Sequence, residues 1–99
     1  DIIIVKKDGR RERFSQEKMK KGIMKACEKR SVSVEKIDKL VNEIEEKLLL
    51  RRKEVKSENM GKIVMQKLKK LDKIAYIRFA SVYRDFKDVS DFKKVMKEV

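Results

Sequence analysis

The 99-residue sequence predicts a mostly helical α+β domain, in which a small three-stranded β-sheet packs on a bundle of four to five helices. Three observations predict this fold class. An N-terminal run of β-branched residues leads into an Asp-Gly turn signal, the later apolar residues recur at helical spacing, and three glycines and no proline leave few helix breaks. A chain of this length supports one modest core, so residues 1–99 are expected to form a single domain.

The first expected element is a β-hairpin. Residues Ile2 to Lys6 are mostly β-branched, Asp8-Gly9 indicates a two-residue turn, and Arg11 to Phe14 can return as the partner strand. A two-stranded ribbon is marginal in water, so the short segment Glu54 to Lys56 is expected to add a third strand. Asp8 and Gly9 are interpreted as turn residues that shape the loop without contacting a ligand.

Helices are expected where a capping residue precedes apolar residues at spacings of three and four. The expected N-caps are Ser15, Ser33, Ser57, Asp72 and Ser90. The first helix is expected to run to about Lys29, and the second to end near the basic cluster at residues 51–53. The inner faces supply the core candidates, which are Met19, Ile23, Ala26 and Cys27; Ile37, Leu40, Val41, Ile44 and Leu48; Met60, Ile63, Val64, Leu68 and Leu71; and Ala75, Tyr76, Phe79, Ala80 and Tyr83. The last helix carries Phe92, Val95 and Met96 on one side, which can cover the core or pair with a neighbouring copy.

Charge and composition limit the function. The formal net charge of +12 favours a polyanionic partner, whether a nucleotide, a nucleic acid or an anionic membrane surface. One cysteine and no histidine exclude an intrachain disulfide, a Cys/His zinc cluster and a His-dependent triad or dyad. The longest apolar run, Ile2 to Val5, is too short to span a bilayer or to act as a signal peptide. We therefore expect a soluble, cytoplasmic protein that is not an enzyme, and, since no initiator Met is present, a piece of a longer chain.

Two segments resemble the ATP-cone family. Residues 5–18, VKKDGRRERFSQEK, resemble the ATP-cone hairpin signature and the helix with a lysine that follows it. Residues 75–89, AYIRFASVYRDFKDV, resemble a more specific run that is typical of the ATP-cones of NrdR repressors, which regulate ribonucleotide reductase genes. The resemblance implies that ATP or dATP, with or without Mg²⁺, binds between the sheet and the helices as a signal and not as a substrate.

The resemblance also implies partners. Nucleotide is expected to control the oligomeric state, with a homo-oligomer as the assembled form, and through it the DNA binding of the repressor. DNA is expected to be contacted only in the full-length protein, by an N-terminal zinc ribbon that these residues do not include. No membrane partner is expected.

A triphosphate needs cations from different backbone elements. Lys6 and Lys7 at the hairpin turn, and Lys18 on the first turn of the following helix, are the expected phosphate clamp, close to helix amides that also favour phosphate. The alternative interpretation of these three lysines is that they are ordinary solvated charges in a lysine-rich chain.

The remaining site residues are carried over from the resemblance by motif position. Ile4 and Val5 would contact the adenine, Glu12 and Ser15 would bind its polar edge, Ser57 and Gly61 would lie near the sugar, and Tyr83 and Lys87 would add an aromatic contact and a further cation. Lys7 stands where Arg is usual, and Gly61 where reductase cones use a side chain. The choice between ATP and dATP therefore stays open.

Structural interpretations stand beside these assignments. Glu12 can instead have a purely structural role in a cross-strand ion pair. Tyr76 and Phe79 are expected to be core residues. For Tyr83, a place in the core and a place in the site are equally expected. Two other functions are also left open: a basic nucleic-acid-binding module, motivated by charge alone, and an ATP-cone of a ribonucleotide reductase itself.

Overall fold

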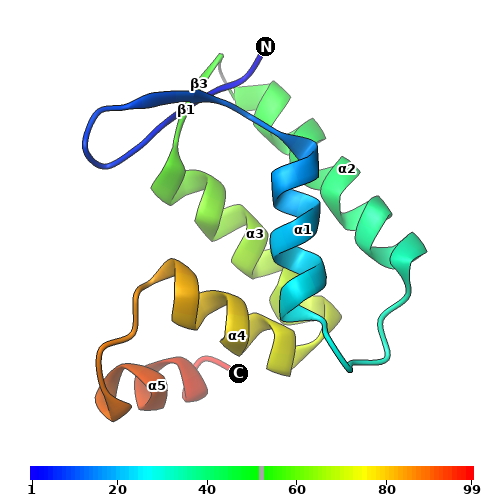
Figure 1. The fold of residues 1–99 in the computed structure, drawn as a ribbon, viewed down its shortest axis with the longest axis vertical. Helices are drawn as coiled ribbons and strands as arrows, with labels where there is room; N and C mark the ends of the chain where they lie inside the picture. The colour runs from blue at the N-terminus through cyan, green and yellow to red at the C-terminus, as the bar shows by residue number, and fades with distance from the viewer. Residues whose placement is uncertain (52) are drawn as a thin grey trace.

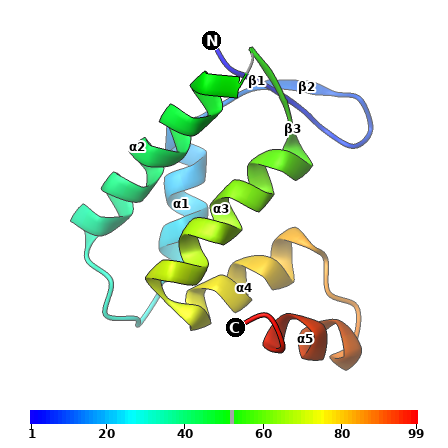
Figure 2. The same ribbon diagram turned by 180° about the vertical axis from the view of Figure 1, so that it is seen from behind.

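The computed structural model describes residues 1–51 and 53–99, so Arg52 of the predicted basic cluster lies outside the described residues. The elements follow the expected order: β1 (Ile3–Val5), β2 (Arg11–Arg13), α1 (Gln16–Ala26), α2 (Val34–Arg51), β3 (Glu54–Lys56), α3 (Ser57–Leu71), α4 (Lys73–Tyr83) and α5 (Val89–Met96). The sheet lies at one end of α1, α2 and α3, while α4 and α5 lie together beside the bundle (Figures 1 and 2). The mostly helical α+β class is confirmed.

The sheet has β1 at its centre, antiparallel to β2 and parallel to β3. Its hairpin loop is one residue longer than predicted, because the Lys6 amide donates to the Arg10 carbonyl at 2.8 Å and closes a loop of residues 7–9. Gly9 has a φ of +88°, whereas Asp8 keeps a negative φ. A two-residue turn of the predicted kind needs positive φ at both central positions, but a three-residue loop needs it only at the final glycine.

Three predicted N-caps are confirmed. The Ser15 hydroxyl accepts from the Lys18 amide at 3.2 Å, Ser33 accepts from the amide three residues later at 3.2 Å, and the Asp72 carboxylate accepts from the Ala75 amide at 2.9 Å. These contacts satisfy amides that the first helical turn leaves without a partner.

Two predicted caps and one helix end are wrong. Ser57 is the first residue of α3 and not its cap, because β3 leads directly into the helix and places extended Lys56 at that position. Asp88 caps α5 in place of Ser90, since its carboxylate accepts from the Ser90 amide at 2.9 Å. The first helix ends at Ala26 and does not reach Lys29, which has a left-handed φ of 60°.

One hydrophobic core joins the sheet and the helices. It includes buried residues from every helix, together with Ile2, Ile4 and Val55 from the N-terminus and the sheet. Cys27 and Tyr76 are buried as predicted, with exposed fractions of 6% and 4%. In α5, Val95 is buried against the core, while Phe92 and Met96 on the same side of the helix are exposed. Across residues 1–51 and 53–99, no helix combines the length and the apolar composition that crossing a membrane requires.

Candidate functional site

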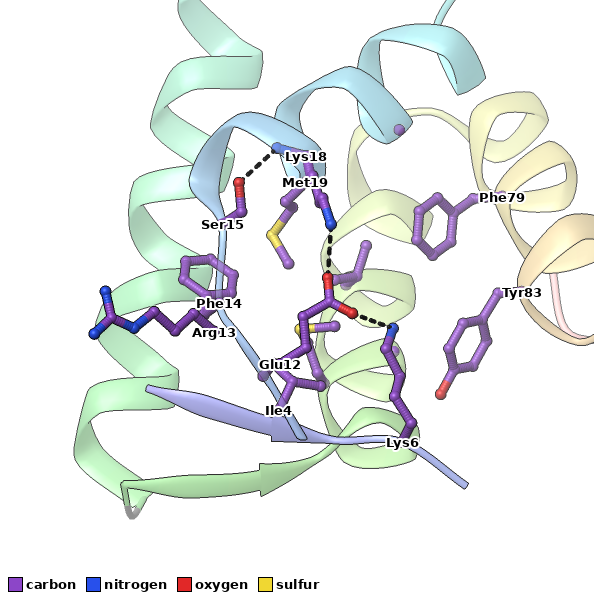
Figure 3. Close-up of a pocket in the computed structure, with 14 residues that line it drawn as sticks. Ile4, Lys6, Glu12, Arg13, Phe14, Ser15, Lys18, Met19, Phe79 and Tyr83 are labelled. Carbon is purple, nitrogen blue, oxygen red and sulfur yellow. Dashed lines mark hydrogen bonds and ion pairs between the residues drawn. The ribbon is translucent and has the colours of Figure 1, made fainter. Parts of the chain in front are cut away.

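A cavity of about 200 Å³ opens between the sheet and the helices α1, α3 and α4 (Figure 3). Its floor is apolar and its rim is polar. The lining residues are Ile4, Lys6, Glu12, Arg13, Phe14, Ser15, Lys18, Met19, Gly22, Met60, Gly61, Val64, Phe79 and Tyr83. We call this space the apolar cavity.

The apolar floor is formed where the inner stripes of the helices reach the edge of the core. Met19 of α1, Met60 of α3 and Phe79 of α4 are only partly buried, although they pack against the core. Flexible thioether side chains adapt to irregular shapes. A flat or compact apolar group can therefore pack against this floor beneath the hairpin.

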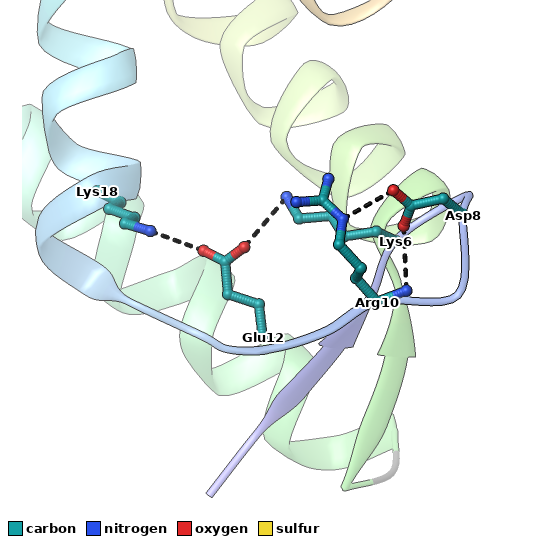
Figure 4. Close-up of polar contacts among 5 residues, drawn as sticks. All are labelled: Lys6, Asp8, Arg10, Glu12 and Lys18. Carbon is teal, nitrogen blue, oxygen red and sulfur yellow. Dashed lines mark hydrogen bonds and ion pairs between the residues drawn. The ribbon is translucent and has the colours of Figure 1, made fainter.

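The rim is organised around the carboxylate of Glu12 on β2. One of its oxygens accepts from the Lys18 ammonium at 2.7 Å, and the other lies 3.8 Å from the Lys6 ammonium (Figures 3 and 4). The hydrogen bond from Lys18, followed by the charges of Lys18 and Lys6, lowers the pKa of Glu12 below its ordinary value. Ser15 caps α1 and so places the first turn that carries Lys18. Two cations from different elements thus meet at one anion.

Tyr83 forms one wall of the cavity. Its hydroxyl donates to the Ser57 carbonyl at 2.9 Å, and its ring stacks on Phe79 with centroids 6.2 Å apart. The ring also lies against Gly61, where an added Cβ would overlap it. Burial, and then the charge of Glu58, raise the pKa of the Tyr83 phenol. Glycine at position 61 is therefore what allows the tyrosine to close this wall.

A second cavity, of about 670 Å³, lies beyond Lys6 and Tyr83, which line both spaces. We call it the polar cavity, because charged side chains dominate its lining. The lining residues are Lys6, Lys7, Asp8, Arg10, Ser57, Glu58, Lys62, Met65, Tyr83 and Arg84.

The structure brings together most of the residues that the sequence singled out. Those that line the apolar cavity are Ile4, Lys6, Glu12, Ser15, Lys18, Gly61 and Tyr83. Lys7 and Ser57 line the polar cavity, so the three predicted clamp lysines do not meet in one space, and Lys6 alone of them lines both. Glu12 does form the cross-strand ion pair that was its structural interpretation.

In the described part of the chain, Val5 and Lys87 line neither cavity. Val5 lies on β1 opposite Arg11 and Lys56. The ammonium of Lys87 lies 3.8 Å from a carboxylate oxygen of Asp85, whose left-handed φ of 53° turns the chain after α4 towards α5.

Sequence reasoning missed several cavity residues. Met19, Met60, Val64 and Phe79 were assigned to core stripes only, and Phe14 was taken simply as the end of a strand. Helical periodicity identifies an inward face but does not distinguish a closed core from a cavity wall that continues it. Arg10, Lys62 and Arg84 of the polar cavity lacked any signal among the many cations of the chain.

Comparison with known proteins identifies the family of this chain. Residues 2–89 match the ATP cone domain. The chain is 50% identical over 103 residues to the transcriptional repressor NrdR of Thermotoga neapolitana, covering 99% of this chain and 64% of that relative. It is also 50% identical to the NrdR repressors of Caldicellulosiruptor saccharolyticus and Listeria welshimeri, covering 99% of this chain and 65% and 64% of those relatives.

The chain thus spans less than two thirds of the length of these relatives, all of which are transcriptional repressors by name. The family match, in contrast, covers almost all of the chain and includes the sheet, the first four helices and both cavities. The chain belongs to the ATP-cone family.

Proposed function

We propose that this chain is the nucleotide-sensing regulatory domain of a transcriptional repressor of ribonucleotide reductase genes. Family membership and the names of the relatives support the sensing and repressor roles. The observation that carries the proposal is the apolar cavity beneath the hairpin, with two lysines from different elements at its rim. An adenine nucleotide combines the two matching features, a flat aromatic base and a polyanionic chain.

The base and the sugar occupy the apolar cavity in this proposal. Ile4 and the neighbouring backbone of Val5 border the adenine, while Glu12 and Ser15 bind its polar edge. Gly61 and Ser57 lie on the side of the sugar. The cavity of about 200 Å³ is smaller than the range of about 300–1,000 Å³ common for pockets that enclose a whole ligand. The phosphate chain must therefore extend beyond it.

The phosphates are held by Lys6, Lys7 and Lys18. Lys18 and Lys6 are already within ion-pairing reach of an anion, the Glu12 carboxylate, and a triphosphate can share or replace that partner with stronger charge. Lys87 can contribute only if the segment after α4 moves towards the site. ATP and dATP are both proposed as ligands, with Mg²⁺ as an optional companion of the phosphates.

The nucleotide acts as a signal in this proposal. Its binding changes the association of copies of the protein, and thereby the DNA binding of the full-length repressor in the cytoplasm through a zinc ribbon outside these residues. Exposed Val82, Val89, Phe92 and Met96 give the α4–α5 side apolar surface, which suits contacts between copies.

Calorimetric titration with ATP and dATP tests the proposal. We expect saturable binding of at least one nucleotide, and Lys18→Glu is expected to weaken it about tenfold or more, since a charge-assisted contact is replaced by repulsion. Lys21→Glu is the matched control, because Lys21 lies on the same helix, pairs with Glu17 at 3.4 Å and lines neither cavity within the described residues. Absence of binding at millimolar nucleotide, or equal loss in both variants, would contradict the proposal.

A further inference from the structure

Arg84, at the C-terminal end of α4, connects the polar cavity to the segment that follows α5. Its side chain lines that cavity, and its guanidinium Nη1 donates to both carboxylate oxygens of Glu98, at 3.2 and 3.3 Å. Arg84 is the C-cap of α4, and Glu98 follows the end of α5 at Met96. One cation therefore faces both the polar cavity and the attachment of α5.

Glu98 is anchored to the core on its other side. The hydroxyl of Tyr76, a residue that is only 4% exposed, donates to Glu98 Oε2 at 2.5 Å. This hydrogen bond does most to lower the pKa of Glu98, and the contact with Arg84 adds to the effect, so the carboxylate is ionised at neutral pH. The amide of Glu98 donates to the carbonyl of buried Val95 at 2.9 Å. The position of Glu98 thus holds the end of α5 against α4.

The contact between Arg84 and Glu98 is open to exchange. Both side chains are 40% exposed, and ion pairs that water reaches contribute little to folding. In the proposed function the phosphates are held partly by Lys6 and Lys7, which line the same cavity as Arg84. A terminal phosphate carries more negative charge than a carboxylate and offers more acceptor oxygens. A bound triphosphate is therefore the stronger partner for Arg84.

We propose that Glu98 and the nucleotide compete for Arg84, so that nucleotide binding releases the end of α5. The inference rests on the proposed function for the position of the phosphates. It gives a regulatory role to Glu98 and Tyr76, neither of which lines either cavity within the described residues. Because linkage is reciprocal, the attached end of α5 weakens nucleotide binding by the same factor. The match to the ATP cone domain ends at residue 89, so Glu98 lies outside it.

The competition acts on the surface that the proposed function assigns to contacts between copies. α5 carries Phe92 and Met96, which are 44% and 46% exposed. When Arg84 turns to the phosphates, Glu98 keeps its hydrogen bond to Tyr76, but a charged link between α4 and the end of α5 is lost. The nucleotide thereby alters how α5 presents its apolar side chains without contacting them.

Calorimetric titration tests the competition. ATP and AMP are titrated at physiological salt into the wild-type protein, Glu98→Gln, Arg84→Gln and the double variant. Glu98→Gln removes the competing charge, so we expect ATP to bind about fivefold more tightly, the lower end of typical couplings between sites. AMP binding should change less than about twofold, because a single phosphate reaches less far into the polar cavity.

Glu46→Gln is the matched control for the loss of charge. It removes a carboxylate from an exposed position on α2, and within residues 1–51 and 53–99 Glu46 lines neither cavity. We expect it to leave the affinity for both nucleotides unchanged.

The double variant separates competition from general repulsion. Any carboxylate near a polyanion weakens its binding through the electric field, and that effect persists when Arg84 is replaced. Competition for Arg84 predicts that Glu98→Gln changes ATP affinity less than about twofold in the Arg84→Gln background. An ATP affinity that Glu98→Gln leaves unchanged or weakens, or an equal gain with and without Arg84, would overturn the inference.

Hydrogen exchange gives a second, independent readout. The amides of Lys97 and Glu98 donate within the last turn after α5, at 3.3 and 2.9 Å. At a protein concentration where sedimentation shows a constant mass, saturating ATP should accelerate their exchange in the wild-type protein. Nucleotide-free Arg84→Gln should show the same fast exchange. Exchange that ATP does not accelerate, or that stays slow in Arg84→Gln, would contradict the release of α5.

The failure of the proposed function gives a different result. Wild-type protein that binds neither ATP nor AMP at millimolar concentration defeats the nucleotide assignment, and the competition with it. Nucleotide binding that Lys18→Glu weakens and Glu98→Gln leaves unchanged supports the proposed function and overturns the competition alone.

Discussion

The phenol ring of Tyr83 lies directly against Gly61, on the face of α3 where any other residue would place its Cβ. Gly61 lies within α3, and Tyr83 is the last residue of α4. Their contact closes the wall between the apolar and the polar cavity. The size of one residue therefore controls the position of the other.

Gly61→Ala is expected to displace the Tyr83 ring and to release its hydrogen bond to Ser57. Alanine in a helix interior is favoured over glycine by about 1 kcal/mol, but here overpacking opposes that gain by about 1–3 kcal/mol. Urea denaturation should show no net stabilisation, and spectrophotometric titration should show a Tyr83 phenol whose pKa is closer to its ordinary value.

Gly22→Ala is the control for this substitution. Gly22 lies within α1, and a Cβ there would meet Phe79 at 3.9 Å, an ordinary van der Waals distance. We expect Gly22→Ala to stabilise the protein by about 0.5–1 kcal/mol. Equal stabilisation by the two substitutions would show that Tyr83 does not occupy the space beside Gly61.

The Glu12 carboxylate is expected to titrate below its ordinary pKa because of Lys18 and then Lys6. A depressed pKa means that the stabilisation from these pairs is present above the ordinary pKa and is lost as the pH falls through the lowered value. Lys18→Met should return the pKa of Glu12 towards its ordinary value, as measured by carboxyl-carbon NMR. Lys21→Met should not move it, and a Glu12 pKa that is the same in all three proteins would contradict the geometry of the rim.

Asp72 is expected to stabilise the fold through two different contacts. Its carboxylate caps α4 at the Ala75 amide and accepts from Arg30 Nε at 3.0 and 3.1 Å. Asp72→Ala should lower the free energy of unfolding by about 1–2 kcal/mol, and Asp72→Asn by less, because the amide oxygen can still cap the helix.

The stability difference between the wild-type protein and Asp72→Asn is expected to change with pH in one direction. Burial opposes ionisation of Asp72, but the hydrogen bonds from Ala75 and Arg30 outweigh it and lower the pKa. The advantage of the wild-type protein over Asp72→Asn should therefore be complete above the ordinary pKa of the carboxyl and shrink as the pH falls through the lowered one. A difference that grows in acid would contradict this account.

The sequence predicted the elements well because most of them carry local signals. Ser15, Ser33 and Asp72 cap helices as expected, because a short polar side chain just before an apolar periodic run can accept a hydrogen bond from a free amide of the first helical turn. The errors arose where two local signals compete. Ser57 follows a strand that continues directly into its helix, and Ser90 lies two residues after Asp88, whose carboxylate is the better acceptor.

The candidate site was predicted only in part, and the reason is physical. Glu12, Lys6 and Lys18 lie on the hairpin and the helix after it, so local sequence brings them together. Phe79, Met60 and Lys62 reach the cavities only through the packing of α3 and α4 against the sheet. Periodicity places such residues on a face, but only tertiary structure shows which part of that face borders an open space.

Methyl NMR of the five methionines tests the central claim most directly. Met19 and Met60 line the apolar cavity and Met65 the polar one, whereas Met24 is 40% exposed and lines neither cavity in the described residues. On titration with ATP, the account predicts saturable shifts of the Met19 and Met60 methyl signals, with Met24 nearly unchanged. Signals of Met19 and Met60 that stay in place at saturating ATP would contradict it.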